Sequence, residues 1–148
     1  MKTMQVNQLD FQILSWKKNL NEIKKIRTVV FLQEQHIPKE LEWDEHDKSA
    51  LHFGLFDKSC LVAYARSIEN NVYWIGRMAV QKEYRKIGIG SRLLQLAIAF
   101  LQDINSQKDI FVSAQVQAIH FYEKNNFSVR GKTYLDAGIV HTDMILRR

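Results

Sequence analysis

Three segments of strand length follow one another between residues 51 and 80, and they constrain the fold more than any other feature of the sequence. Residues 51–56 and 61–68 are apolar, and the turn residues 57–59 separate them. Asn70 and Asn71 tolerate positive φ, so they predict a second turn that leads into residues 72–80. The sequence therefore predicts a meander of three strands.

Two helical patterns flank this meander. Asn19, followed three residues later by Glu22, resembles the capping box that starts a helix, and apolar residues then recur at helical spacing to about Gln35. After a turn at residues 85–90, a second series of apolar residues marks a long helix that ends near Asn105. We expect both helices to pack an apolar face against the strands.

The other segments complete the element order. Residues 11–16 and 109–114 are short and apolar enough for strands, residues 115–125 suit a short helix, and residues 127–130 and 139–146 suit closing strands. The sequence shows no internal repeat, linker or break in composition. It therefore predicts a single domain of the mixed α/β (α+β) class.

The composition agrees with one globular domain over residues 1–148. Hydrophobic residues make up 46% of the chain, which is ample for a core, and only one proline is present. No apolar run reaches the length of about 18 residues that a membrane span needs, and the first residues lead into polar sequence instead of a signal core. We expect a cytoplasmic protein that does not bind a membrane.

Cys60 and the balance of charge exclude further classes. The chain has one cysteine, so it can form no internal disulfide, and within the apolar run of residues 60–63 we expect Cys60 to be a small buried hydrophobe. The net charge is +5, but the basic residues are not interleaved with aromatic residues as in nucleic-acid-binding proteins. We expect no nucleic acid partner.

Acidic residues gather in the segment 40–47. Arg66 and Arg77 lie in predicted strands, where buried ion pairs with this acidic segment are the structural interpretation. His36 and His46 lie in or beside the segment, but they show no recognised spacing of metal ligands. We expect no metal site.

The segment 77–94, RMAVQKEYRKIGIGSRLL, suggests a site for phosphate. A buried strand leads into a turn that contains Gly88 and Gly90, and an amphipathic helix follows directly. Glycines let the backbone approach a ligand, and a helix N-terminus adds partial positive charge. The spacing differs from a nucleotide P-loop and from a dinucleotide-binding fingerprint, and a plain strand-to-helix turn is the alternative interpretation.

The flanking sequence decides between these interpretations. The chain resembles the GNAT superfamily of acyl-CoA-dependent N-acyltransferases, whose pyrophosphate turn has the form R/Q-x-x-G-x-G/A, matched by residues 85–90. Residues 114–127, AQVQAIHFYEKNNF, are similar to a later segment of that family, and stretches such as residues 27–38 and 138–144 are similar to its ElaA-like branch. The resemblance implies a mostly antiparallel twisted sheet of roughly six to seven strands flanked by about four helices.

The resemblance also implies acetyl-CoA as the co-substrate. Its pantetheine arm would pair with the strand at residues 78–80 as an extra strand, and backbone amides of residues 86–91 would hold the pyrophosphate. An N–H group near Ala79 or Val80 would stabilise the oxyanion. The cofactor-binding residues implied are Met78, Ala79, Val80, Arg85, Lys86, Ile87, Gly88, Ile89, Gly90, Ser91 and Gln115.

Tyr122 matches the family tyrosine that protonates the leaving thiolate, and the resemblance implies that it is the general acid. Spacing alone gives a different interpretation, because Tyr122 follows Ala118 by four residues on an apolar helical face and would then be a core residue. Only the motif favours a catalytic role.

The acceptor amine needs a base or a water relay, and Glu34 is our first candidate for that base. Arg27 lies seven residues earlier on the same helical face, so both could reach an acceptor cleft or belong to a solvated ion-pair stripe. Asp44 and Glu45 would attract a cationic amine, or they are simply solvated. His141 could hydrogen-bond the acceptor, although a histidine on a half-buried strand is more often structural.

The leading hypothesis is an enzyme that moves an acetyl or related acyl group from acetyl-CoA to a primary amine of a small molecule or a protein. One alternative is a non-catalytic CoA-sensing module. The other is an enzyme similar to acyl-homoserine-lactone synthases, suggested by Arg27, Phe31, Trp43, Asp44 and Asp47. The acceptor, the preferred acyl chain and a homodimeric state stay open.

Overall fold

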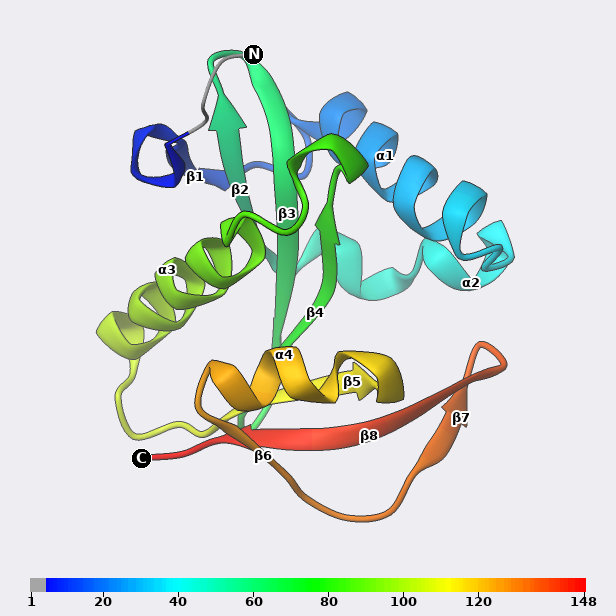
Figure 1. Cartoon of the computed structure of the whole chain (residues 1–148), viewed down its shortest axis with the longest axis vertical. Coiled ribbons are helices and arrows are strands. Elements are labelled where there is room, and N and C mark those ends of the chain that lie inside the picture. The colour runs from blue at the N-terminus through cyan, green and yellow to red at the C-terminus, as the bar shows by residue number, and fades with distance from the viewer. Residues whose placement is uncertain (1–4) are drawn as a thin grey trace.

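One twisted sheet runs through the protein. The computed structural model describes residues 5–148, and these form eight strands in the order β1-β2-β3-β4-β5-β8-β6, with β7 paired to β8 (Figure 1). All neighbours are antiparallel except β4 and β5, as expected for a mixed α/β fold. The strands are β1 (Asp10–Leu14), β2 (Leu51–Asp57), β3 (Cys60–Glu69), β4 (Tyr73–Val80), β5 (Ile110–Gln115), β6 (Phe127–Val129), β7 (Tyr134–Asp136) and β8 (Ile139–Leu146).

Helices cover the sheet. The helices are α1 (Leu20–Arg27), which continues as a π-helix (Thr28–Glu34), α2 (Lys39–Glu42), α3 (Ile89–Ile104) and α4 (Ile119–Lys124); short 3-10 turns lie at Val6–Gln8, Glu45–Lys48, Lys82–Tyr84 and Val116–Ala118. None of the helices in residues 5–148 is long and apolar enough to cross a membrane.

The two long helices lie on opposite faces of the sheet. Ile23 and Ile26 of α1 belong to the same buried cluster as Tyr64, whereas Leu93 of α3 belongs to a second cluster that contains Ala63 and Ala65. Successive side chains of a strand point to opposite faces, so Tyr64 and its two neighbours on β3 separate the two cores. The helical periodicity of the sequence had predicted both buried faces.

The β4–β5 pair is the point where the sheet divides. These strands are parallel neighbours only where Tyr73, Trp74 and Ile75 pair with residues 110–112. Beyond that point β4 continues beside β3, and β5 continues beside β8. Figure 1 shows the two arms running in clearly different directions. Within the described residues, the edge of β4 that faces β5 therefore has no strand partner from Gly76 to Val80.

A β-bulge lies in the free part of β4. Ala79 pairs with Tyr64 and Gly76 pairs with Arg66, so Arg77 and Met78 together stand opposite a single residue of β3. Such a bulge bends the strand and leaves one residue outside the ladder. The bulge follows Gly76, and its left-handed residue is Arg77, with φ of 51°.

Two local expectations were wrong, and one strand was missed. Asn19 is the N-cap residue of α1, but the expected capping box is absent, because the Asn19 side chain accepts a hydrogen bond from the backbone N–H of Ser15 at 2.9 Å. Cys60 is exposed, not buried, because β3 begins there at the hairpin turn and the buried run starts at Leu61. Strand β7 was missed because it has only three residues and all of them are exposed.

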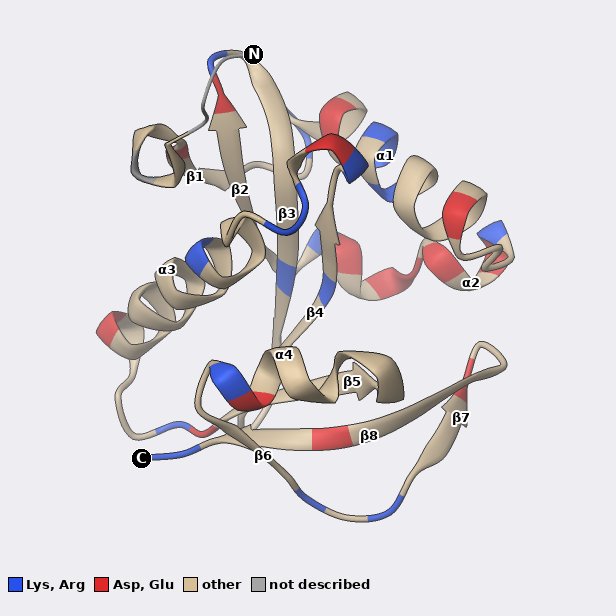
Figure 2. Cartoon of the chain, in the orientation of Figure 1, with Lys and Arg blue, Asp and Glu red and all other residues tan. Residues whose placement is uncertain are grey.

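Buried ion pairs fasten the acidic segment to the sheet. Arg27 has no exposed surface, and its guanidinium donates to Glu42 Oε2 at 2.6 Å and to Asp47 Oδ1 at 2.7 Å. Arg66 of β3 donates to Asp44 Oδ1 at 2.7 Å and to Asp47 Oδ1 at 2.8 Å. Figure 2 shows the acidic residues of this segment beside the basic residues of β3 and β4. The buried ion pairs that the sequence predicted between Arg66 and the acidic segment are therefore confirmed.

Arg77 extends the same network. Its guanidinium donates to the backbone carbonyl of Glu42 at 3.0 Å and to Asp44 Oδ2 at 3.3 Å. Arg27 also stacks over the Trp43 ring, 4.6 Å from the ring centre. Removing a charge from such a buried network leaves its partner uncompensated, which costs more than the pair itself stabilises.

Asp47→Asn should destabilise the fold by about 3–5 kcal/mol, because Arg27 and Arg66 both lose their shared carboxylate. Burial alone would raise the pKa of Asp47, but its hydrogen bond to Arg27, the charge of Arg27 and the hydrogen bond to Arg66 outweigh burial and lower the pKa. The free energy of unfolding in urea measures the effect.

Glu45→Gln is the control, because Glu45 lies in the same 3-10 turn but is exposed. An acid titration adds a second check. A lowered carboxyl pKa contributes stability above the unfolded value of about 3.9, and that contribution is lost as the pH falls through the folded-state value. Equal stability of Asp47→Asn and Glu45→Gln would contradict the role of the network.

Candidate functional site

A cleft of about 330 Å³ lies where the two arms of the sheet diverge. The π-helix and α2 form one wall, the free edge of β4 forms the base, and β5, β8 and α4 form the opposite wall. The lining residues are Phe31, Gln35, Ile37, Leu41, Glu42, Gly76, Arg77, Met78, Val80, Gly90, Ser113, Gln115, Ala118, Phe121, Tyr122, Asp136, Ala137, Ile139 and His141.

The glycine turn meets one end of this cleft. Lys86 and Gly88 adopt left-handed φ values of 67° and 86°, and α3 begins at Ile89. The first N–H groups of a helix have no intrahelical partners and carry partial positive charge. A side-chain Cβ at Gly90 would lie 3.4 Å from the Phe121 ring, so the glycine allows α3 and α4 to approach closely.

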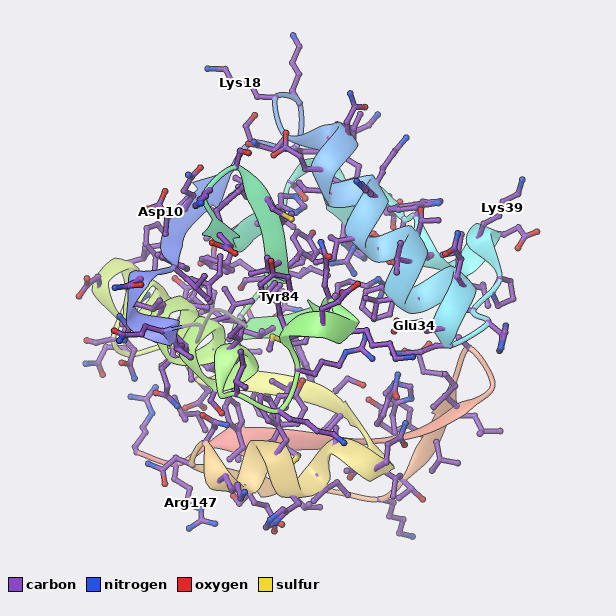
Figure 3. All side chains as sticks on the ribbon, turned by 45° about the horizontal axis from the view of Figure 1, so that its top comes forward. Asp10, Lys18, Glu34, Lys39, Tyr84 and Arg147 are labelled. Carbon is purple, nitrogen blue, oxygen red and sulfur yellow. The ribbon has the colours of Figure 1, made fainter. Side chains whose placement is uncertain are left out.

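Arg85 ties the turn to two other elements. Its Nε donates to the backbone carbonyl of Val80 at 2.8 Å, and its Nη2 forms a bidentate ion pair with Glu34. Figure 3 labels Glu34 on the π-helical segment that faces the turn. The carboxylate of Glu34 is thus engaged with Arg85, and Glu34 does not line the cleft.

Tyr122 lines the cleft from α4. Its side chain is 7% exposed, and its ring makes edge-to-face contacts with Phe121 and Phe127, with ring centres 5.1 Å and 5.8 Å away. Burial raises the pKa of Tyr122, so its hydroxyl keeps its proton at neutral pH. Tyr122 is therefore a buried core residue, as its spacing predicted, and it also lines the cleft.

Polar side chains line the wall formed by β5 and β8. Gln115 donates to Gln35 Oε1 at 2.8 Å, which connects the two sides of the cleft. The Nδ1 atom of His141 lies 2.7 Å from the backbone carbonyl of Ile139, so this nitrogen carries the hydrogen. The Nε2 atom of the neutral ring is then an acceptor.

Glu42 lies in the opposite wall. Burial raises the pKa of Glu42, and the charges of Arg77 and Arg27 offset that effect only in part. The carboxylate is held at 2.6 Å from Arg27 Nε. The cleft therefore carries a buried acidic group at one wall and the hydrogen-bonding groups of Gln115 and His141 at the other.

The structure brings together only some of the residues that the sequence suggested. Met78, Val80, Gly90, Gln115, Tyr122 and His141 line the cleft, whereas Ala79 and Ile89 are buried and Arg85, Lys86, Ile87, Gly88 and Ser91 form the adjoining turn and helix start. Arg27 and Asp44 belong to the ion-pair network, and Glu45 is exposed outside the cleft.

Sequence reasoning missed several residues that line the cleft. Phe31 was named only for the alternative similar to acyl-homoserine-lactone synthases, and Leu41 and Ala137 were not singled out because they come from segments far apart in the chain. Residues 5–148 contain no group of three or more His, Cys, Asp or Glu side chains that could hold a metal ion.

Comparisons with known proteins agree with this geometry. Residues 19–148 match the family model described as an acetyltransferase (GNAT) domain. The Bacillus subtilis protein named N-acetyltransferase YjcF is 31% identical over 133 residues, which cover 86% of this chain and 94% of that protein.

Solved structures share the fold. Escherichia coli ElaA superimposes with a TM-score of 0.85 at 24% identity, over 93% of this chain and 99% of that chain. The Thermoplasma acidophilum PaiA N-acetyltransferase in complex with coenzyme A superimposes with a TM-score of 0.71 at 19% identity, over 92% of this chain and 98% of that chain.

Proposed function

The chain belongs to the acetyltransferase (GNAT) domain family, and from this premise we propose that an acetyl group passes directly from acetyl-CoA to a primary amine held in the cleft. The observation that carries this proposal is the divergence of β4 and β5. It places the free edge of β4, the glycine turn and Tyr122 around one cavity.

The residues of the turn fit the pyrophosphate of CoA. A Cβ added at Gly88 would meet no other atom within 4 Å, so the turn is open to a ligand. Successive N–H groups of residues 86–91 at the start of α3 suit an anion. The Thermoplasma acidophilum relative in complex with coenzyme A supports this assignment.

The free edge of β4 suits the pantetheine arm. From Gly76 to Val80 the strand has no partner on the side of β5, so its backbone groups can pair with an extended ligand. Met78 and Val80 line the cleft beside this edge. An N–H group near Ala79 or Val80 would donate to the carbonyl oxygen as it gains negative charge.

Tyr122 supplies the proton for the departing sulfur. Acetyl-CoA provides a thioester carbonyl, the neutral amine attacks it, the new C–N bond forms and the C–S bond breaks. The thiolate then takes the hydroxyl proton of Tyr122, and the amine gives up one proton to an acidic residue or a relay. The raised pKa of Tyr122 keeps the acid protonated before the reaction.

The geometry favours a positioning role for Glu34. Its carboxylate holds Arg85 beside the turn, which orients the phosphate-binding backbone. Arg27 and Asp44 act in the same indirect way, because their ion pairs hold α2 at the cleft. His141 is the predicted acceptor-side residue that lines the cleft, and we assign its Nε2 to contact with the acceptor.

A screen of amines with acetyl-CoA, with free thiol as the readout, tests this function. At least one primary amine should raise the rate of thiol release above that of hydrolysis. Binding of acetyl-CoA by calorimetry without acetylation of any amine would favour the CoA-sensing alternative. Thiol release with S-adenosylmethionine as the acceptor would favour the alternative similar to acyl-homoserine-lactone synthases.

Tyr122→Phe should lower kcat by about 100-fold or more, because the thiolate loses its general acid. The dissociation constant for acetyl-CoA should not change, since the substitution removes one hydroxyl and leaves the turn intact. Tyr73→Phe is the matched control, because Tyr73 is also buried but lies at the end of β4 that is paired with β5. Full activity of Tyr122→Phe would contradict the assignment.

Gly88→Ala should weaken CoA binding by about tenfold, because an L-residue in the left-handed region is strained by about 1–2 kcal/mol and its Cβ would occupy ligand space. Gly131→Ala is the matched control. Gly131 also has positive φ and open space around it, but it lies in the β6–β7 connection away from the cleft. Both variants should lose a similar amount of stability. Calorimetry should show weaker binding of CoA only for Gly88→Ala.

A further inference from the structure

Three polar side chains form a hydrogen-bonded line from the cleft to the outer edge of the sheet. Ser113 of β5 lines the cleft, and its hydroxyl is hydrogen-bonded to the hydroxyl of Tyr134 of β7. Tyr134 in turn donates to Asp143 Oδ1 of β8 at 2.6 Å. The function proposed above assigns no role to these residues.

The sheet register places the three side chains on one face. Ser113 stands directly opposite Asp143 in the β5–β8 pair, and Tyr134 stands opposite His141 in the β7–β8 pair. His141 and Asp143 are two residues apart, so their side chains share a face. That face also carries Gln115, which lines the cleft with Ser113 and His141. Figure 1 shows β7 running beside β8 at this edge.

The hydrogen positions along the line follow from the donor inventory. A tyrosine hydroxyl has one hydrogen, and a carboxylate can only accept. Tyr134 therefore gives its hydrogen to Asp143, and Ser113 must give its own hydrogen to Tyr134. The Ser113 oxygen is left with free lone pairs at the cleft, where it can accept a hydrogen from a bound amine.

We propose that Ser113, Tyr134 and Asp143 form the relay that removes the proton from the acceptor amine. This inference rests on the proposed acetyl transfer and names its base. As the C–N bond forms and the C–S bond breaks, the amine proton moves to Ser113 Oγ. The Ser113 hydrogen moves to Tyr134 Oη, and the Tyr134 hydrogen moves to Asp143, while Tyr122 protonates the sulfur.

Proton transfer along the relay leaves no charge on Ser113 or Tyr134. Partial burial of the Tyr134 hydroxyl and its hydrogen bond to Asp143 raise the pKa of Tyr134 to about 12, so Tyr134 is neutral at physiological pH and passes a proton on without storing charge. Asp143 is only partly buried and Tyr134 is exposed, so the proton that reaches Asp143 can pass to water. Ser113 is the catalytic residue, and Tyr134 and Asp143 act through it.

The carboxylates of Glu34 and Glu42 are less suited to this step. Glu34 is paired with Arg85 and lies outside the cleft wall. Glu42 lines the cleft, but a proton placed on it would remove one of the two carboxylate charges that compensate the buried guanidinium of Arg27. Asp143 forms no ion pair with a cationic side chain within residues 5–148, so it can accept a proton without breaking an ion pair.

Asp143→Asn separates a relay from a structural role. The amide oxygen can still accept the Tyr134 hydrogen bond, but an amide cannot take up the proton. We expect kcat to fall about 100-fold with the best amine of the screen, while KM for acetyl-CoA and thermal stability stay close to the wild type. Ser113→Ala and Tyr134→Phe should lower kcat similarly, and combining either with Asp143→Asn should lower it little further.

Asp57→Asn is the matched control, because Asp57 also accepts a tyrosine hydroxyl, that of Tyr84 at 3.1 Å, but lies outside the cleft. Wild-type kcat in Asp143→Asn would overturn the relay and leave the acetyl transfer intact. A wild-type protein that binds acetyl-CoA and acetylates no amine would instead overturn the proposed function, and the relay with it.

Discussion

The divergence of β4 and β5 is the constraint on which the site depends. Two parallel strands that separate after three paired residues expose backbone groups that a continuous sheet would use internally. The bulge at Arg77 and Met78 bends β4 further away, and the cleft occupies the resulting space. The free edge of β4 and the glycine turn that follows it therefore meet Tyr122 at one cleft, although α4 lies much later in the sequence.

Buried charge holds the wall of the cleft that contains α2 in place. The segment with α2 and the following 3-10 turn is short and polar, and it buries little apolar surface of its own. Arg27, Arg66 and Arg77 bind it to the sheet through charge-assisted hydrogen bonds and backbone carbonyls. An acidic cluster that resembles a cation-binding surface in sequence is thus largely neutralised inside the protein.

Elements with strong local signals were predicted well. The meander, the α3 helix and the glycine turn follow from periodicity, short turns and φ requirements, all of which act within about one helical turn or one hairpin. Weak local signals were misleading. Asn19 had a capping spacing but bonds backward to Ser15, and β7 is too short and too exposed to show alternation. The exposure of Cys60 depends on where β3 begins, and sequence patterns locate the ends of strands poorly.

The sequence by itself determined the family and the mixed α/β fold, and it suggested the glycine turn as a phosphate site and Tyr122 as the candidate acid, because the motifs that indicate them are contiguous stretches. Only the tertiary structure decided what the charged side chains do. Glu34 meets Arg85 across 51 positions of the chain, Arg27 meets Asp47 across 20, and Ser113 meets Tyr134 across 21. Such contacts depend on strand register and on the angle between the two arms of the sheet, and no local pattern of residues encodes either of these quantities.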